Sequence, residues 1–226
     1  MNNVTSSNTV LSFLRVELRS AVLLLFAAIL LLVGSFPVRL QPESAEAQTF
    51  AYRLNGGPFN RETWIGTTGT YASWYYDRAQ LAIASWNLAQ TFGGQYVASF
   101  TQQSLWSLSE LDWYSADYGY GYRGLTLWYL YGGTPATTSN WDYAELRLND
   151  TPTGTVHGDA VANTTSSKQR VQSTSAHEMG HGLALSHVSS EGSTASRLMS
   201  DSISRYDIYG TYTPMSGDIA ALDAAY

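Results

Sequence analysis

The sequence predicts an α+β fold in which a mixed, twisted sheet packs on two long helices and a short helix closes the chain. Two stretches, residues 71–91 and residues from about 168 through 181, are long enough to form these helices. Between them, short runs rich in aromatic and branched residues alternate with glycine, as in strands and their connections. The chain has 226 residues, so one domain with a sizeable core can form after residue 47.

The first 47 residues are predicted to be an export signal. Arg15 and Arg19 precede an apolar run over residues 21–38, and a small-x-small cleavage pattern, Ala-Glu-Ala, ends at residue 47. An uncleaved signal anchor is the alternative, because about 18 apolar residues can just span a bilayer. Both interpretations export residues 48–226, which are then secreted or are held at a membrane only through residues 21–38.

Composition agrees with export and excludes other classes of protein. The formal net charge is −6, and residues 48–226 contain one lysine, so the basic stripe that nucleic-acid binding needs is absent. The sequence has no cysteine, which excludes a small scaffold held by disulfides.

The first long helix is predicted over residues 71–91. Its apolar residues recur at alternating spacings of four and three, which gives one buried face: Tyr75, Ala79, Ala82, Trp86 and Ala89. Gly93 and Gly94 are expected to stop it.

The strands are expected in the middle of the chain. Residues 95–102 alternate weakly, and residues 105–133 predict loop with one or two strands, of which residues 124–129 are the best candidate. Residues 141–148 predict a further strand, followed by a turn over residues 149–154.

The second long helix is expected to start after an N-cap at Ser166 or Ser167. The last stretch, residues 216–226, predicts a short amphipathic helix. Its inward residues would be Ile219, Leu222 and either Ala225 or Tyr226.

The most informative segment is residues 177–187, His-Glu-Met-Gly-His-Gly-Leu-Ala-Leu-Ser-His, which holds three of the four histidines. In a helix, His177 and His181 project from one face with their Cβ atoms about 6 Å apart. Both rings can then bind one Zn²⁺ at roughly 2.0–2.1 Å. Glu178 is placed to hold a water on the metal without being a ligand, and His187 can supply a third nitrogen if the chain turns back. Three protein ligands and an open position are typical of catalytic zinc sites.

These residues resemble the active-site segment of the metzincin clan of zinc endopeptidases, and within it secreted bacterial matrixin-like catalytic domains. The resemblance covers about residues 60–226. It rests on the early long helix, the strand ending near Leu148, the motif from His177 to His187, and Met199 downstream. It implies a zincin-like fold with Met199 in a tight turn beneath the metal.

The resemblance also implies a secreted zinc-dependent endopeptidase. His177, His181 and His187 would bind Zn²⁺, and Glu178 would be the general base that takes a proton from the zinc-bound water and passes it to the leaving amine. The expected partner is a peptide or protein substrate that extends a sheet edge drawn from residues 120–130. The enzyme is expected to be a monomer.

The sequence departs from the clan pattern at Ala184, where the clan usually has glycine three residues after the second histidine. Either the exit turn begins earlier, near Gly182, or Ala184 bears backbone strain. Asp201 and Glu191 are therefore alternatives to His187 as third ligand. Asp201 also occupies the position where several clan members have a tyrosine.

Further metal sites and rival functions complete the expectations. His157 is expected either to bind a second metal or to make an ordinary hydrogen bond. Calcium could be held by Asp142, Asp150 and Asp159, although no Asp-x-Asp-x-Asp-Gly loop supports it.

The aromatic residues of 105–133 are either core and strand or a platform for carbohydrate or a hydrophobic substrate. The rival functions are a zinc hydrolase acting on cell-wall peptides and a zincin-fold binding module, inactive or weakly active, for extracellular protein or carbohydrate.

Overall fold

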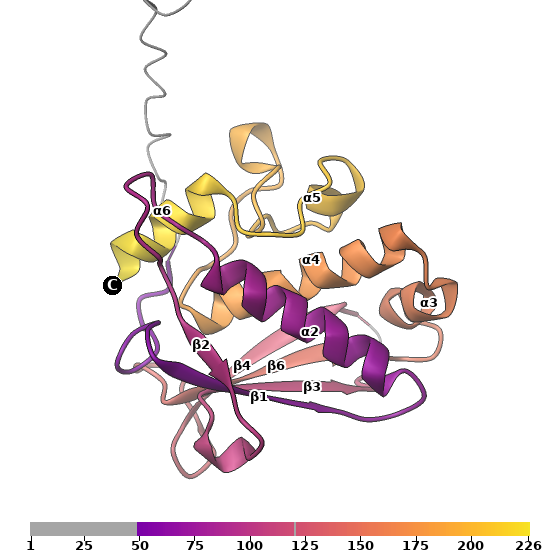
Figure 1. Cartoon of the computed structure of the whole chain (residues 1–226), viewed down its shortest axis with the longest axis horizontal. Coiled ribbons are helices and arrows are strands. Elements are labelled where there is room, and N and C mark those ends of the chain that lie inside the picture. The colour runs from indigo at the N-terminus through magenta and orange to yellow at the C-terminus, as the bar shows by residue number, and fades with distance from the viewer. Residues whose placement is uncertain (1–48, 120) are drawn as a thin grey trace, which may run out of the picture. The chain divides into compact units, whose positions relative to one another are not determined.

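A six-stranded mixed sheet and two long helices form the body of the protein in this computed structural model, which describes residues 49–119 and 121–226 (Figure 1). The predicted export signal over residues 1–47, with its apolar run over residues 21–38, lies outside the described residues. Within the described part, no helix has both the length and the apolar character needed to cross a membrane.

The sheet has the strand order β2-β1-β3-β6-β4-β5. Four strands run parallel: β2 (Phe100–Gln102), β1 (Arg61–Thr67), β3 (Leu111–Ala116) and β6 (Tyr143–Asn149). The other two, β4 (Gly124–Leu130) and β5 (Thr134–Pro135), make antiparallel pairs. Since β5 pairs only with Tyr129 and Leu130, it covers just the end of the outer edge of β4. The predicted mixed sheet is confirmed.

The two long helices, α2 (Ala72–Asn87) and α4 (Thr165–Gly182), lie side by side over one face of the sheet (Figure 1). The predicted stripe of α2 is confirmed, because Tyr75, Ala79, Ala82 and Trp86 are all buried in this helix. The Trp86 indole N–H donates to the Ala176 carbonyl of α4 at 2.9 Å and joins the two helices. The hydrophobic core fills the space between these helices and the sheet.

Three predicted boundaries are wrong. α2 ends at Asn87, well before the glycine pair, and the strand expected over residues 95–102 is reduced to Phe100–Gln102 because the chain turns between Gln90 and Tyr96. The N-cap of α4 is Thr164, not Ser166 or Ser167. The Thr164 hydroxyl accepts from the Ser167 N–H at 3.1 Å and the Ser167 hydroxyl accepts from the Thr164 N–H at 2.8 Å, so Ser167 completes a capping box.

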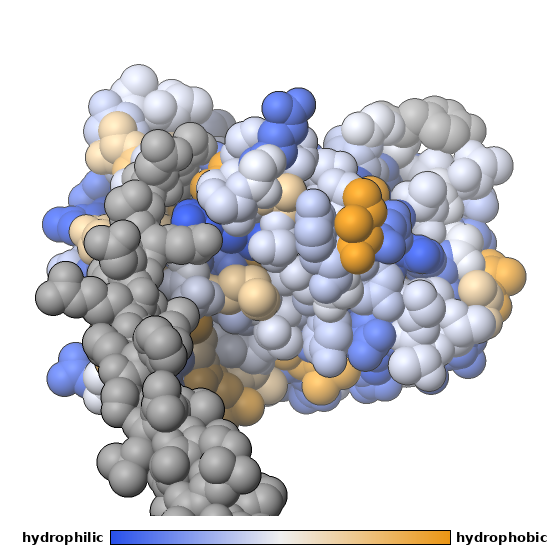
Figure 2. All heavy atoms as spheres, turned by 90° about the horizontal axis from the view of Figure 1, so that it is seen from above, coloured by the Kyte–Doolittle hydropathy of each residue, from blue (hydrophilic) through white to orange (hydrophobic). Residues whose placement is uncertain are grey.

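The closing helix is confirmed as α6 (Ser216–Ala225), which buries Leu222 but leaves Tyr226 38 % exposed. The sequence did not predict several other elements: β1, α3 (Thr155–Ala162), α5 (Ser204–Asp207) and the 3-10 turns η1 (Trp106–Leu108) and η2 (Gly192–Thr194). On the face of the molecule seen in Figure 2, strongly hydrophobic residues form small separate patches with polar surface between them.

Candidate metal centre

His177 and His181 lie in the last turns of α4, and the way this helix ends brings His187 back toward them. The Leu185 N–H donates to the Gly180 carbonyl at 2.9 Å and the Ala184 N–H to the His181 carbonyl at 3.1 Å. These two bonds form a Schellman motif, whose key residue takes a left-handed conformation and is usually glycine. Here that residue is Ala184, with φ of 76°. Of the two alternatives for the exit turn, the strained alanine is therefore the one observed.

The last carbonyls of α4 receive further donors from the sheet and from the start of the described chain. Trp128 of β4 donates its indole N–H to the His181 carbonyl at 3.2 Å, and Trp141 donates to the Gly182 carbonyl at 3.3 Å. The Phe50 N–H donates to the Ala184 carbonyl at 2.9 Å, and its ring packs edge-on against Trp128. Because helix-end carbonyls lack partners within the helix, these bonds fix the position of the exit turn.

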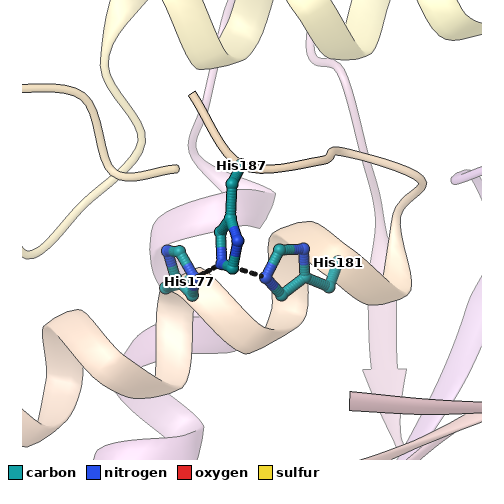
Figure 3. A group of neighbouring side chains, drawn as sticks. All are labelled: His177, His181 and His187. Carbon is teal, nitrogen blue, oxygen red and sulfur yellow. Dashed lines mark hydrogen bonds between the residues drawn. The ribbon is translucent and has the colours of Figure 1, made fainter. Parts of the chain in front are cut away.

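Three imidazole nitrogens converge at this turn (Figure 3). The Nε2 atom of His187 lies 3.0 Å from Nε2 of His177 and 3.0 Å from Nε2 of His181. These histidines are the one group of three or more potential metal-ligating side chains found within residues 49–119 and 121–226. His177 and His181 are buried, whereas His187 is exposed, so the group opens to solvent on the side of His187.

Hydrogen bonds orient the two helical rings. Nδ1 of His177 lies 2.7 Å from the Leu198 carbonyl oxygen and Nδ1 of His181 lies 2.7 Å from that of Leu185. Because a carbonyl only accepts, each Nδ1 carries the proton and each Nε2 presents a lone pair to the centre. Burial lowers the pKa of His181 to about 4 and the pKa of His177 well below its usual range, and it also lowers the pKa of His187. The three rings are therefore neutral at pH 7, as metal ligation requires.

This arrangement fits a metal ion. His187 has one hydrogen at most on Nε2, yet two acceptor nitrogens face it at 3.0 Å. A cation at the centre satisfies all three lone pairs at once, and three neutral imidazoles suit the first-row transition metals, including zinc.

Glu178 lies beside this group and is held from β4. The Thr126 hydroxyl donates to Glu178, lying 2.8 Å from its Oε2 and 2.9 Å from its backbone oxygen. A Cβ on Gly124 would come within 2.6 Å of the Glu178 Cγ and Oε1 atoms, so glycine at this position makes room for the carboxylate. Burial raises the pKa of Glu178 to about 7, against the lowering effects of the Thr126 hydrogen bond and the Arg205 charge. Such a group can take up and release a proton near neutral pH.

Met199 packs beneath the histidine-bearing helix. A Cβ on Gly180 would lie 2.3 Å from the Met199 sulfur, and Met199 is 2 % exposed. Met199 lies in a turn over residues 197–200, the methionine turn, which the Ser200 N–H closes by donating to the Arg197 carbonyl at 3.2 Å. Asp218 of α6 fixes this turn, since its carboxylate accepts from the N–H of Leu198 at 3.0 Å and of Met199 at 3.2 Å. The Leu198 carbonyl in turn bonds His177. The turn thus supports both the helix and one of its histidines.

The alternative ligands are not gathered at this site. The potential metal-ligating group within the described residues contains His187, and neither Asp201 nor Glu191 belongs to it. His157 lies apart, with Nδ1 2.7 Å from Asp150 Oδ1, as its ordinary hydrogen-bond interpretation expects.

The three aspartates considered for calcium also lie in different places. Asp142 bonds Asn55, Asp150 accepts from the Tyr75 hydroxyl, and Asp159 pairs with Arg123 and Arg170. The structure does not bring them together in one group within the residues that it describes.

Four residues around the site were not found from the sequence: Gly124, Thr126, Arg205 and Asp218. Thr126 had a signal, because it is a polar residue at an inward position of an otherwise apolar strand. Asp218 had a weaker one as an acidic residue in the first turn of a short helix. Arg205, 5 % exposed in α5, had none.

Comparison with models of known protein families finds none that matches this chain, and comparison with curated proteins likewise finds no match. The structure alone shows an α+β fold with a mixed six-stranded sheet and a three-histidine group able to hold a metal ion.

Proposed function

We propose that this protein is an exported zinc-dependent endopeptidase of the metzincin type. The proposal rests on one observation above all: three Nε2 atoms converge next to a buried glutamate that is hydrogen-bonded but not part of the group. A structural zinc site has four protein ligands, whereas three histidines leave a position for water and substrate. The methionine turn beneath the helix adds support, since Met199 packs on Gly180 within the motif.

The residues divide the chemistry between them. His177, His181 and His187 would hold the ion. When bound, Zn²⁺ supplies Lewis-acid chemistry, since it makes a water acidic and polarises a carbonyl group. Glu178 accepts a proton from the attacking water and then donates it to the leaving amine, which matches its raised pKa of about 7. Thr126 holds the Glu178 carboxylate in one orientation through its hydroxyl.

The substrate would lie along β4 as an added strand. The Trp128 carbonyl points outward, where it accepts from Ala136 N at 2.9 Å, so the backbone groups of Gly124 and Thr126 point the same way by alternation. β5 pairs only with the far end of this strand. An extended peptide can therefore hydrogen-bond to β4 next to Glu178, within the range of residues 120–130 expected from the sequence.

The test is Glu178→Gln, compared with Glu191→Gln, a matched change at an exposed glutamate. Glu178→Gln should bind zinc within about twofold of wild type and lose at least about a hundredfold in peptide hydrolysis, because it cannot accept the proton. Glu191→Gln should match wild type in both. Zinc affinity is measured by competition with a chelating dye, and hydrolysis with a peptide mixture read by mass spectrometry.

Hydrolysis by Glu178→Gln at the wild-type rate would refute the assigned base. A zinc-loaded wild type that cuts no peptide in a diverse mixture would refute the endopeptidase proposal itself, and incubation with cell-wall material would then decide for the rival hydrolase.

A further inference from the structure

Arg205 is a buried cation that forms no ion pair within the described residues, although Glu178, Asp218 and Asp207 act on its charge from further away. It lies in α5 (Ser204–Asp207) and is 5 % exposed. Its Nη1 donates to the carbonyls of Ser200 at 3.2 Å and Ser202 at 3.1 Å. In the described part of the chain, its Nε has no hydrogen-bond partner, and Arg205 is in none of the ion pairs.

Such a charge is costly, because removing a guanidinium from water is offset only when an anion lies beside it. Burial lowers the pKa of Arg205 to about 10, so the group stays charged at neutral pH. Two partly exposed arginines show the contrast: Arg123 and Arg170 both bond the carboxylate of Asp159 at 2.6 Å. Arg205 therefore has unused capacity to bind an anion.

Arg205 lies near the metal centre. Its helix α5 packs against α4 (Figure 1), and its Nη1 bonds the carbonyl of Ser200, the residue after Met199. Burial is the main cause that lowers the pKa values of His177, His181 and His187, and the positive charge of Arg205 adds to this lowering. The same charge attracts the Glu178 carboxylate and so opposes the effect of burial on its pKa.

The position of Arg205 relative to β4 indicates which half of a substrate it faces. Glu178 contacts the start of β4 at Gly124 and Thr126, whereas Trp128, further along this strand, contacts His181. Ion pairs join this end of β4 to α5: Arg123, next to Gly124, bonds Asp159, which also bonds Arg170, and Arg170 bonds Asp207 of α5. Arg205 is thus at the Glu178 end of the edge. Because Glu178 gives its proton to the leaving amine, the leaving half of a substrate lies at that end.

We propose that Arg205 binds a carboxylate in the leaving half of the substrate, so that the site selects peptides with an acidic side chain or a free carboxyl terminus just after the scissile bond. This inference rests on the proposed endopeptidase function. An arginine fork matches the geometry of a carboxylate, and a buried polar site discriminates against ligands that leave it unpaired. Because Arg205 is only 5 % exposed, a single side chain or a chain terminus of the substrate would reach it, so the selection concerns one position and not the overall charge of the peptide.

A purely structural role makes a different prediction. If Arg205 only ties the carbonyls of Ser200 and Ser202, its replacement weakens the fold or the activity toward all peptides equally. A carboxylate site instead changes the ratio between matched substrates.

The experiment uses the zinc-loaded full chain. Cleavage positions in a peptide mixture are mapped first, and kcat/KM is then measured for paired peptides with Glu or Gln directly after the scissile bond. A second pair carries a free or an amidated carboxyl terminus at that position, which distinguishes the two sources of carboxylate. Wild type should favour the carboxylate in at least one pair by about tenfold or more, the scale of a charged hydrogen bond.

Two variants remove the charge and one retains it. Arg205→Gln and Arg205→Met should bring the ratio of kcat/KM between the carboxylate peptide and its neutral partner close to one. Arg205→Met replaces the buried charge by an apolar chain of similar length. Arg205→Lys should lower it several-fold, since lysine lacks the planar fork. Arg53→Gln, at an exposed arginine outside the site, should leave the ratio unchanged. Circular dichroism shows which variants fold.

A ratio near one for both peptide pairs in wild type overturns the proposal whatever the variants do. A preference for the carboxylate that persists in any folded variant lacking the charge overturns it as well.

If wild type binds zinc but cuts no peptide, the endopeptidase proposal fails separately. Binding of acetyl-Gly-Glu-amide and acetyl-Gly-Gln-amide is then compared by calorimetry. A preference for the glutamate peptide that Arg205→Gln removes retains the carboxylate site, whereas equal binding overturns it.

Discussion

Ala184 combines a left-handed backbone with complete burial. Its φ is 76° and it is 1 % exposed, so its methyl group is strained by the backbone but packed in the core. The strain costs about 1–2 kcal/mol and the buried methyl contributes about 0.8 kcal/mol, so the two effects nearly cancel. This balance explains how alanine can occupy a position that favours glycine.

Ala184→Gly should therefore change the free energy of unfolding by less than about 1 kcal/mol, in either direction. The matched control is Ala79→Gly, also at 1 % exposure but within α2, which should destabilise the protein by about 2 kcal/mol through lost methyl burial and helix propensity. Urea unfolding measures both. Equal destabilisation of the two variants would show that Ala184 bears no strain.

Gly124 leaves room for the side chain of Glu178, the proposed general base. In Gly124→Ala, the new Cβ would meet Glu178 Cγ and Oε1 at 2.6 Å, so the carboxylate must move. Peptide hydrolysis should fall by about tenfold to a hundredfold while zinc affinity stays within about twofold. Gly158→Ala is the control, since a Cβ there meets nothing within 4 Å in α3. An unchanged hydrolysis rate in Gly124→Ala would contradict the assigned role of Glu178.

At the residue scale, the sequence predicted the three histidines that the structure brings together and the glutamate beside them, but not the residues that hold them in place. The spacing of His177, Glu178 and His181 depends only on helix geometry, which a sequence reveals. The roles of Thr126 and Asp218 depend on contacts across 52 and 20 residues, respectively. Their positions could not be inferred without the register of β4 against α4 and the docking of α6.

Among the elements, α2 was predictable from its periodic apolar residues, whereas α4 was predicted from a serine N-cap candidate and from the spacing of His177 and His181. β1 was missed because its buried positions, Thr63 and Ile65, include a polar residue whose hydroxyl bonds the Leu111 carbonyl at 2.9 Å. β2 has three residues, too few for a periodic pattern, and turn residues precede it. Whether a short segment forms a strand depends on its packing against neighbouring strands, and the sequence does not show which strands are neighbours.

Strand β3 carries a buried acid that makes stability depend on pH. Leu111 and Trp113 face the helices, so Asp112 faces the other side of the sheet, where the Ser109 hydroxyl donates to it. Burial raises the pKa of Asp112 from its usual 3.8 to about 7. The folded state therefore keeps a proton that the unfolded chain releases, and stability falls as the pH rises from about 4 to about 7.

Asp112→Asn should reduce this dependence and leave the part that comes from Glu178, whose pKa burial also raises to about 7. The variant should match wild type near pH 4 and exceed it by about 1–2 kcal/mol at pH 8, allowing for solvent screening. Asp223→Asn, at an exposed aspartate of α6, should follow the wild-type curve. The measurement is the urea midpoint from pH 4 to pH 8. A variant with the same slope as wild type in this range would exclude Asp112 as its source.

For the whole molecule, the metal centre joins parts of the chain that are distant in sequence. α4 provides two of the histidines, and the segment after its exit turn provides the third. The methionine turn bonds one of the helical histidines, and α6 in turn holds the methionine turn. A ligand that binds only this assembled state stabilises all of these parts together.

Zinc at about a hundredfold above its dissociation constant should add about 2.7 kcal/mol, which corresponds to roughly 5–10 °C in Tm for a domain of this size. A chelator should reverse the shift, as followed by calorimetry. His187→Ala should show a much smaller shift, because one of three ligands is lost. A metal-independent Tm in wild type would contradict the proposed centre.

If the chain is exported as predicted, the contact between Phe50 and the exit turn would link removal of the signal to the histidine group. If the export signal is removed after residue 47, as the sequence predicts, the new amino terminus lies two residues before Phe50, whose N–H bonds the Ala184 carbonyl. An imprecise cut that also removed Phe50 would leave that carbonyl and one side of Trp128 without their partner. The accuracy of the signal-processing enzyme would then set the fraction of molecules with a fully supported third ligand.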